Sequence, residues 1–116
     1  MMSDPIHLDV QQVSDELRIR PEIYLKIAVS FVNSLDGKMK TLSEALFDNN
    51  RDQMRMILHE IKGTAGNLRL KNISTVEAAM HEAVKAGEAP AKLSQHFEAL
   101  RAEALKTQMY FHSLSR

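Results

Sequence analysis

Apolar residues recur at every third or fourth position along most of the chain, the spacing of one face of an amphipathic α-helix. Four long runs of this kind follow one another, and no segment shows the alternation that is typical of a strand. The apolar positions are Tyr24, Ile27, Phe31, Leu35, Met39, Leu42 and Leu46 in the first run, Met54, Ile57, Leu58, Ile61, Ala65 and Leu68 in the second, Val76, Met80 and Val84 in the third, and Leu93, Phe97, Leu100, Ala104 and Phe111 in the fourth. The pattern predicts an all-α protein.

Polar residues, prolines and a glycine at the ends of these runs predict the helix boundaries. Pro21 and Pro90 suit the first turn of a helix, and Gly87 suits the position after a last turn. These signals predict long helices over about 21–47, 51–70 and 74–87 and from residue 90 onward, after a short helix that begins near residue 10. Three pairs fit the capping box, a polar residue followed three positions later by Gln or Glu: Asp9 with Gln12, Asn50 with Gln53, and Ser74 with Glu77.

Short loops between long helices favour antiparallel neighbours. We therefore expect an antiparallel up-down four-helix bundle with a short N-terminal capping helix. The 116 residues suit a single domain over 1–116, in which residues 1–20 form an N-terminal tail and the cap helix.

Composition narrows the classes of partner. Fifteen basic residues balance fifteen acidic ones, so non-specific binding to nucleic acid or to an anionic membrane is not expected. The absence of cysteine excludes disulfides and thiolate metal sites. Residues 1–9 carry no basic segment followed by an apolar one, and no apolar run is long enough to cross a bilayer. We expect a cytoplasmic monomer without a cofactor.

The predicted helix over 51–70 is the one that core packing alone does not explain. With about 100° per residue, His59 lies about 160° from Ile61, on the face opposite the core. Two exposed glycines in a helix cost together about 2 kcal/mol relative to alanine, and exposed Met and Leu gain nothing from the fold. Such a surface lets a partner approach the imidazole closely. The residues predicted to surround His59 are Met56, Gly63, Gly66 and Leu70.

The residue types on this face suit phosphoryl chemistry. An exposed imidazole is partly neutral at pH 7, and its neutral ring nitrogen can accept a phosphoryl group. Lys62, one turn after His59, could offset the phosphoryl charge. Arg55, Lys62 and Arg69 recur at seven-residue intervals and predict a basic edge. Because the chain has no Gly-rich phosphate-binding loop, the phosphoryl group would have to come from another protein.

The segment from His59 to Leu68, HEIKGTAGNL, resembles the signature of histidine-containing phosphotransfer (HPt) domains, His-x-Leu/Ile-Lys-Gly followed by small residues. The predicted order of helices is similar as well. The resemblance implies that His59 is the phosphoacceptor, that Lys62 stabilises the phosphoryl group and that Gly63 keeps His59 accessible. It further implies that receiver domains of response regulators or a hybrid sensor kinase are the partners, and that the protein is a phosphocarrier without kinase activity of its own.

One departure from the family pattern stands out. The family commonly has a second glycine ten residues after the histidine, where this chain has Arg69. The departure could mark a different partner preference or a helix that is less open on that side. We expect Arg55, Met56, Gly66 and Leu70 to contact the partner.

The same residues also allow other interpretations. Gly66 and Asn67 could simply end the helix, and Arg55 and Arg69 could be ordinary solvated charges. The same surface could serve a helical docking module that is never phosphorylated. Glu77 and His81 lie one turn apart and could supply two metal ligands. A di-iron bundle needs Glu-x-x-His on two helices, and neither copy is present, so we expect no metal site. The apolar spacing predicts that Met39, Met54, Met80 and Met109 fill the core.

Overall fold

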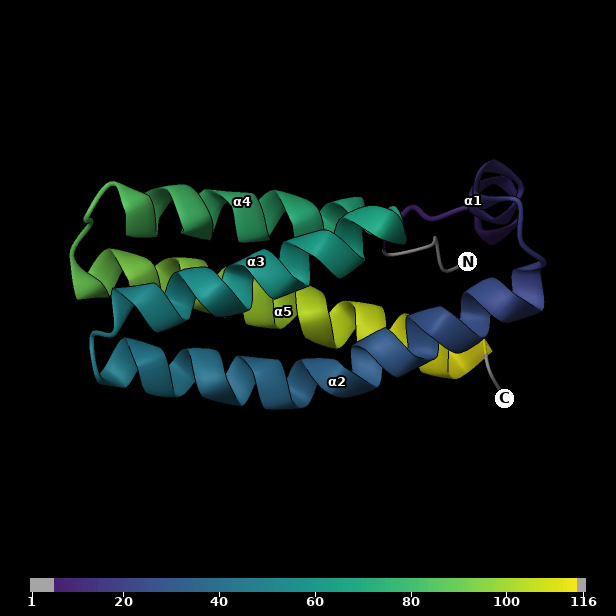
Figure 1. Cartoon of the computed structure of the whole chain (residues 1–116). Helices are drawn as coiled ribbons and strands as arrows, with labels where there is room; N and C mark the ends of the chain where they lie inside the picture. The colour runs from purple at the N-terminus through teal and green to yellow at the C-terminus, as the bar shows by residue number, and fades with distance from the viewer. Residues whose placement is uncertain (1–5, 115–116) are drawn as a thin grey trace.

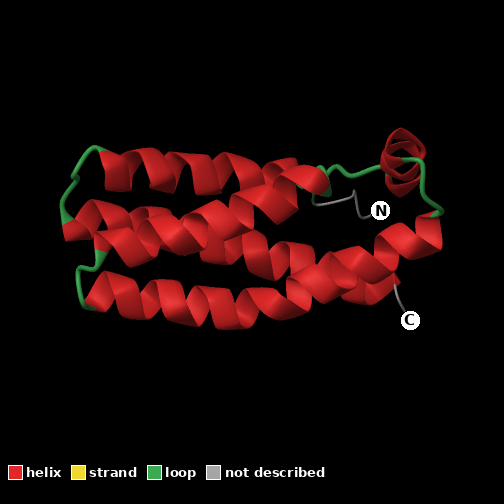
Figure 2. Ribbon diagram, in the orientation of Figure 1, coloured by secondary structure: helices red, strands yellow, loops and turns green. Residues whose placement is uncertain are grey.

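The computed structural model describes residues 6–114, and these residues form helices and no strand (Figure 2). The all-helical prediction is confirmed. None of the helices in this range is both long and apolar enough to span a bilayer. The elements are α1 (Val10–Leu17), α2 (Pro21–Phe47), α3 (Arg51–Asn67), α4 (Lys71–Lys85) and α5 (Pro90–Leu114).

The four long helices lie side by side, and α1 sits at one end beside the start of α2 (Figure 1). Each long helix contacts two of the others: α2 packs against α3 and α5, and α4 packs against α3 and α5. The apolar stripes meet between them and form one continuous core. The largest side chains that are fully buried include Tyr24, Leu35, Leu42, Met54, Leu58, Ile61, Met80, Leu93, Leu100 and Phe111.

Two of the predicted capping boxes form helix N-termini. The carboxylate of Asp9 accepts a hydrogen bond from the backbone N–H of Gln12 at 3.0 Å, and the side chain of Asn50 accepts one from the N–H of Gln53 at 3.1 Å. Each bond satisfies a backbone donor that the first turn of a helix leaves without a partner. The starts of α1 and α3 are therefore fixed by local sequence.

The third capping box is not a helix start. α4 begins at Lys71, three residues before Ser74, with Leu70 as its N-cap. Glu77 lies in the middle of α4 with its side chain 1% exposed, where it contacts His81 instead of the backbone. The chain turns earlier than predicted because α3 also ends earlier than predicted, at Asn67.

Two apolar side chains predicted to lie in the core are exposed. Met109 is 65% exposed and Ile27 is 45% exposed, whereas Met54 and Met80 are fully buried. Helical spacing places a residue on a face, but the width of the buried stripe depends on how closely the neighbouring helices approach. The glycine at position 37 does not interrupt α2, which is continuous from Pro21 to Phe47.

Candidate functional site

His59 lies in the middle of α3 on its exposed face. The opposite face of α3 is anchored in the core by Leu58 and Ile61, both fully buried. The His59 side chain is exposed, and within residues 6–114 its ring makes no hydrogen bond and no ion pair. The histidine therefore stands on a rigid support without being held by the protein itself.

Bare backbone lies beside His59, as the sequence predicts. Gly63 and Gly66 are both exposed within α3, and a Cβ atom added at either position would meet no atom within 4 Å beyond its chain neighbours and the adjoining backbone of α3. Internal packing therefore does not require these glycines, although they cost the helix about 2 kcal/mol in propensity. Met56 adds an apolar side chain that is 56% exposed. We call His59, Met56, Gly63 and Gly66 the His59 face.

Charged residues flank the His59 face on both sides. Toward α2, Glu60 forms an ion pair with Lys38 at 3.1 Å. Toward α4, Lys62 borders a small hollow and forms no ion pair within the described part of the chain. Arg55 is paired with Asp52 on the same helix, which reduces the field of both charges. Lys62 is thus a cation next to His59 that is not neutralised by a partner.

The structure corrects the prediction for Leu70, whose side chain is buried and only 1% exposed. α3 ends at Asn67, and Arg69 adopts the left-handed conformation with φ 61°. The backbone N–H of Leu70 donates to the carbonyl of Ala65 at 2.9 Å, and that of Arg69 donates to the carbonyl of Gly66 at 3.1 Å. This pair of bonds is a Schellman motif, which reverses the chain and directs Leu70 into the core.

The same turn explains the departure at position 69. The residue that follows the C-cap of a Schellman motif needs a positive φ, which glycine adopts without a steric cost. A glycine ten residues after the histidine therefore suits the backbone of the turn. Arg69 adopts this conformation despite its Cβ, so the backbone of the turn is the one that a glycine would have. What Arg69 adds is its side chain.

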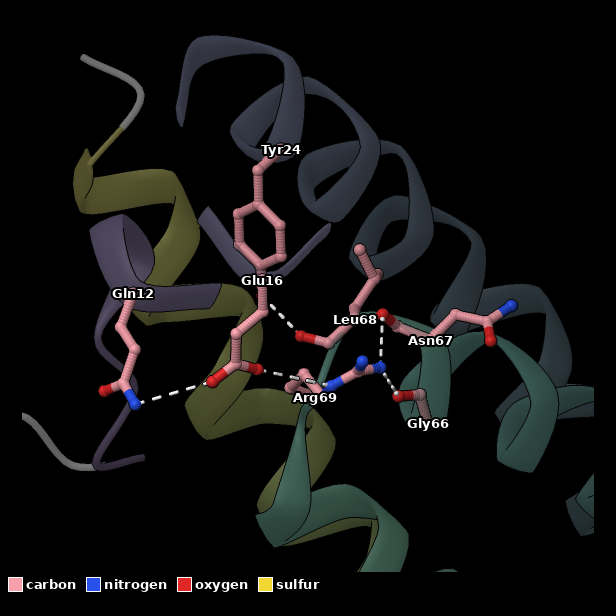
Figure 3. Close-up of polar contacts among 7 residues, drawn as sticks. All are labelled: Gln12, Glu16, Tyr24, Gly66, Asn67, Leu68 and Arg69. Carbon is pink, nitrogen blue, oxygen red and sulfur yellow. Dashed lines mark hydrogen bonds and ion pairs between the residues drawn. The ribbon is translucent and has the colours of Figure 1, made fainter. Parts of the chain in front are cut away.

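The Arg69 side chain turns back over the end of α3 instead of extending the predicted basic edge (Figure 3). Its Nη1 donates to the carbonyls of Gly66 at 3.2 Å and Asn67 at 3.3 Å. Its Nε lies 3.7 Å from a carboxylate oxygen of Glu16 on α1. Arg69 is not on α3, so the seven-residue row ends at Lys62. The arginine links the end of α3 to α1.

Tyr24 supports this turn from inside the core (Figure 3). Its hydroxyl donates to the carbonyl of Leu68 at 2.7 Å, which satisfies an acceptor that the end of α3 leaves open. Burial raises the pKa of Tyr24 well above its ordinary value, and the nearby Tyr110 adds to the shift. The sequence offered no signal for this role, because Tyr24 simply fits the apolar stripe of α2.

Glu77 and His81 come together on α4, with Oε2 of Glu77 3.1 Å from Nδ1 of His81. Within residues 6–114, no group of three or more histidine or acidic side chains is arranged to hold a metal ion. The pair is a contact between two side chains one turn apart on the same helix.

In a comparison with protein families, residues 26–109 fit the model of the Hpt domain. The matched span includes most of α2, all of α3 and α4, and most of α5. The chain belongs to the Hpt domain family. Hpt domains carry out histidine phosphotransfer in phosphorelay signalling, as carriers and not as autonomous kinases. Comparison with curated proteins and with solved structures gives no significant match.

Proposed function

We propose that this Hpt domain is the histidine phosphotransfer protein of a multistep phosphorelay, in which His59 exchanges a phosphoryl group with aspartates of receiver domains. One observation carries the proposal. The only histidine of α3 is exposed on a packed helix, and the backbone beside it is left bare by two glycines that the fold itself does not need.

The reaction is a transfer between two nucleophiles. A neutral ring nitrogen of His59 attacks the phosphorus of a receiver aspartyl phosphate. The N–P bond forms while the P–O bond to the carboxylate breaks, so that the aspartate leaves as a carboxylate. The proton on the second ring nitrogen can leave to water, because His59 is exposed. The reverse reaction passes the group to another receiver.

The neighbouring residues have separate roles in this proposal. The ammonium of Lys62 offsets charge on the phosphoryl group during transfer and in the phosphohistidine. Gly63 lets the receiver approach the ring without meeting a side chain. Met56 and Gly66 provide an apolar docking surface, and Arg55 is a cation at its edge. Leu70 no longer belongs to this set because it is buried.

The proposal also covers the organisation of the protein. The whole chain acts as one Hpt module, an antiparallel up-down four-helix bundle capped by α1. It works as a cytoplasmic monomer with receiver domains or a hybrid sensor kinase as partners, and with neither nucleic acid nor membrane. It has no kinase activity of its own, so incubation with labelled ATP alone leaves it unlabelled.

The test is phosphoryl transfer from a panel of receiver domains phosphorylated with labelled acetyl phosphate. We expect acid-labile, base-stable label on the wild type and none on His59→Gln. The matched control is His96→Gln, which changes a histidine of α5 away from α3 and should be labelled like the wild type. If receivers bind but His59 is never labelled, the domain is a docking module that is not phosphorylated. If receivers neither bind nor transfer, the proposal fails.

A further inference from the structure

The helices α3 and α4 enclose a small hollow next to the His59 face. From α3, Lys62 is the only residue that lines it. The hollow therefore places the cation assigned to the phosphoryl group against a set of polar side chains from another helix. The residues of α4 that line it are Glu77, Ala78, His81, Glu82 and Lys85.

Glu77 is unusual among these residues because its side chain is only 1% exposed. A buried carboxylate is costly unless hydrogen bonds satisfy it. One oxygen of Glu77 meets Nδ1 of His81 at 3.1 Å, whereas the other is buried without a hydrogen-bond partner. The single contact with His81 therefore does not offset the cost of burying the Glu77 carboxylate.

His81 is held by this contact at the wall of the hollow, with its side chain 21% exposed. When the Glu77 carboxylate accepts a hydrogen bond, Nδ1 of His81 carries the proton. In the neutral ring, Nε2 then keeps a lone pair and can accept a hydrogen bond. Glu77 thus determines which nitrogen of His81 is available to a donor.

The charges of the hollow favour Lys62 as that donor. Glu82 and Lys85 are paired with each other at 3.3 Å, so they largely neutralise one another. A Glu77 carboxylate with a neutral His81 carries one negative charge, and Lys62 has no ion pair within the described residues. An ammonium has three N–H donors on a long, flexible stem.

We propose that the Glu77–His81 pair positions the Lys62 ammonium beside His59 through a hydrogen bond from Nζ of Lys62 to Nε2 of His81. This inference rests on the proposed function. One donor of the ammonium is used on His81, and two remain for the phosphoryl oxygens on His59. Glu77 and His81 are positioning residues, because neither needs to touch the phosphoryl group.

The kinetic test uses a receiver that labels the wild type. We expect His81→Ala to slow transfer to His59 and to shorten the lifetime of the phosphohistidine by about five-fold each, the effect of one ordinary hydrogen bond. His81→Gln should stay within about two-fold of the wild type, since an amide oxygen can accept the same bond. His96→Ala is the matched control and should have no effect.

A double-mutant cycle with Lys62→Ala separates positioning from a structural role. If His81 acts through Lys62, His81→Ala should change transfer by less than about two-fold in the Lys62→Ala background. Circular dichroism and thermal unfolding verify that each variant is folded. Equal effects of His81→Ala in both backgrounds, or no effect in either, would overturn the inference.

Nitrogen-15 NMR of the histidine rings tests the geometry without any phosphoryl donor. In the unphosphorylated protein, His81 should show a protonated Nδ1, and Lys62→Ala should shift its Nε2 signal while leaving that of His96 unchanged. An unchanged Nε2 signal refutes the contact with Lys62. If no receiver labels even the wild type, the proposed function has failed, and this spectrum still decides whether the pair holds Lys62.

Discussion

Position 69 offers a test of how the turn after α3 is stabilised, through the two variants Arg69→Gly and Arg69→Ala. Alanine removes the side-chain contacts and keeps the strain of a left-handed residue. Glycine removes both. The difference between the variants therefore reports the backbone conformation, and the difference between alanine and the wild type reports the side chain.

The magnitudes follow from the geometry. The left-handed conformation costs a residue with a Cβ about 1.5 kcal/mol. Replacement by glycine removes this cost, but the greater freedom of glycine in the unfolded chain offsets about 0.7 kcal/mol of the gain. The ion pair to Glu16 is long, at 3.7 Å, and the two side chains are 43% and 48% exposed, so it contributes about 0.5 kcal/mol. The shared hydrogen bonds to two carbonyls contribute about the same.

We therefore expect Arg69→Ala to lower the free energy of unfolding by about 1 kcal/mol and Arg69→Gly to leave it within about 0.5 kcal/mol of the wild type. For a domain of this size, 1 kcal/mol corresponds to about 4 °C in Tm. Urea unfolding followed by circular dichroism measures all three proteins. If Arg69→Gly is as unstable as Arg69→Ala, the strain assigned to φ 61° at this position is wrong.

Three further predictions concern the site and its support. Lys62→Ala should slow transfer to His59 and shorten the phosphohistidine lifetime by about ten-fold, because the side chain acts on the phosphoryl charge. The Tm should not change, because the side chain is exposed. Rates equal to those of the wild type would contradict this role. Gly63→Leu should raise the free energy of unfolding by about 1 kcal/mol, since a Cβ there meets open space, yet block receiver binding in a pull-down assay; retained binding would contradict the steric argument. Tyr24→Phe should cost about 1–3 kcal/mol by leaving the Leu68 carbonyl without its donor. Because burial raises the pKa of Tyr24, the unfolded chain releases the hydroxyl proton at a lower pH than the folded protein does. The wild type should therefore lose stability as the pH rises above about 10, and the difference in the free energy of unfolding between the wild type and Tyr24→Phe, measured in urea, should narrow there.

Local sequence was sufficient for most of the helices. Asp9 and Asn50 cap α1 and α3 as predicted because their bonds reach only three residues along the chain. Ser74 carried the same signal and misled, because the start of α4 is determined by the turn before it. That turn depends on Arg69 adopting a positive φ, which no propensity of arginine indicates.

The sequence likewise predicted some features of the candidate site correctly and others not. The helical wheel placed His59, Gly63 and Gly66 on the exposed side of α3, where the structure has them. It placed Leu70 there too, since a wheel continues past the point where the helix ends. The contacts between helices could not be predicted. The hydrogen bond from Tyr24 to Leu68 joins residues that are distant in the sequence. The place of Glu77 in the wall of the hollow depends on how α3 and α4 pack.

Among residues 6–114, His59 has no hydrogen-bond partner, so under the proposed function its phosphorylation would break no hydrogen bond there. The protein has a formal net charge of zero, and a phosphoryl group adds about −1.5 to −2 at pH 7. The loaded and empty forms would then differ in net charge and hardly in shape. A native gel or an ion-exchange column should separate them where size-exclusion chromatography does not, and a receiver could distinguish them only by touching the His59 face.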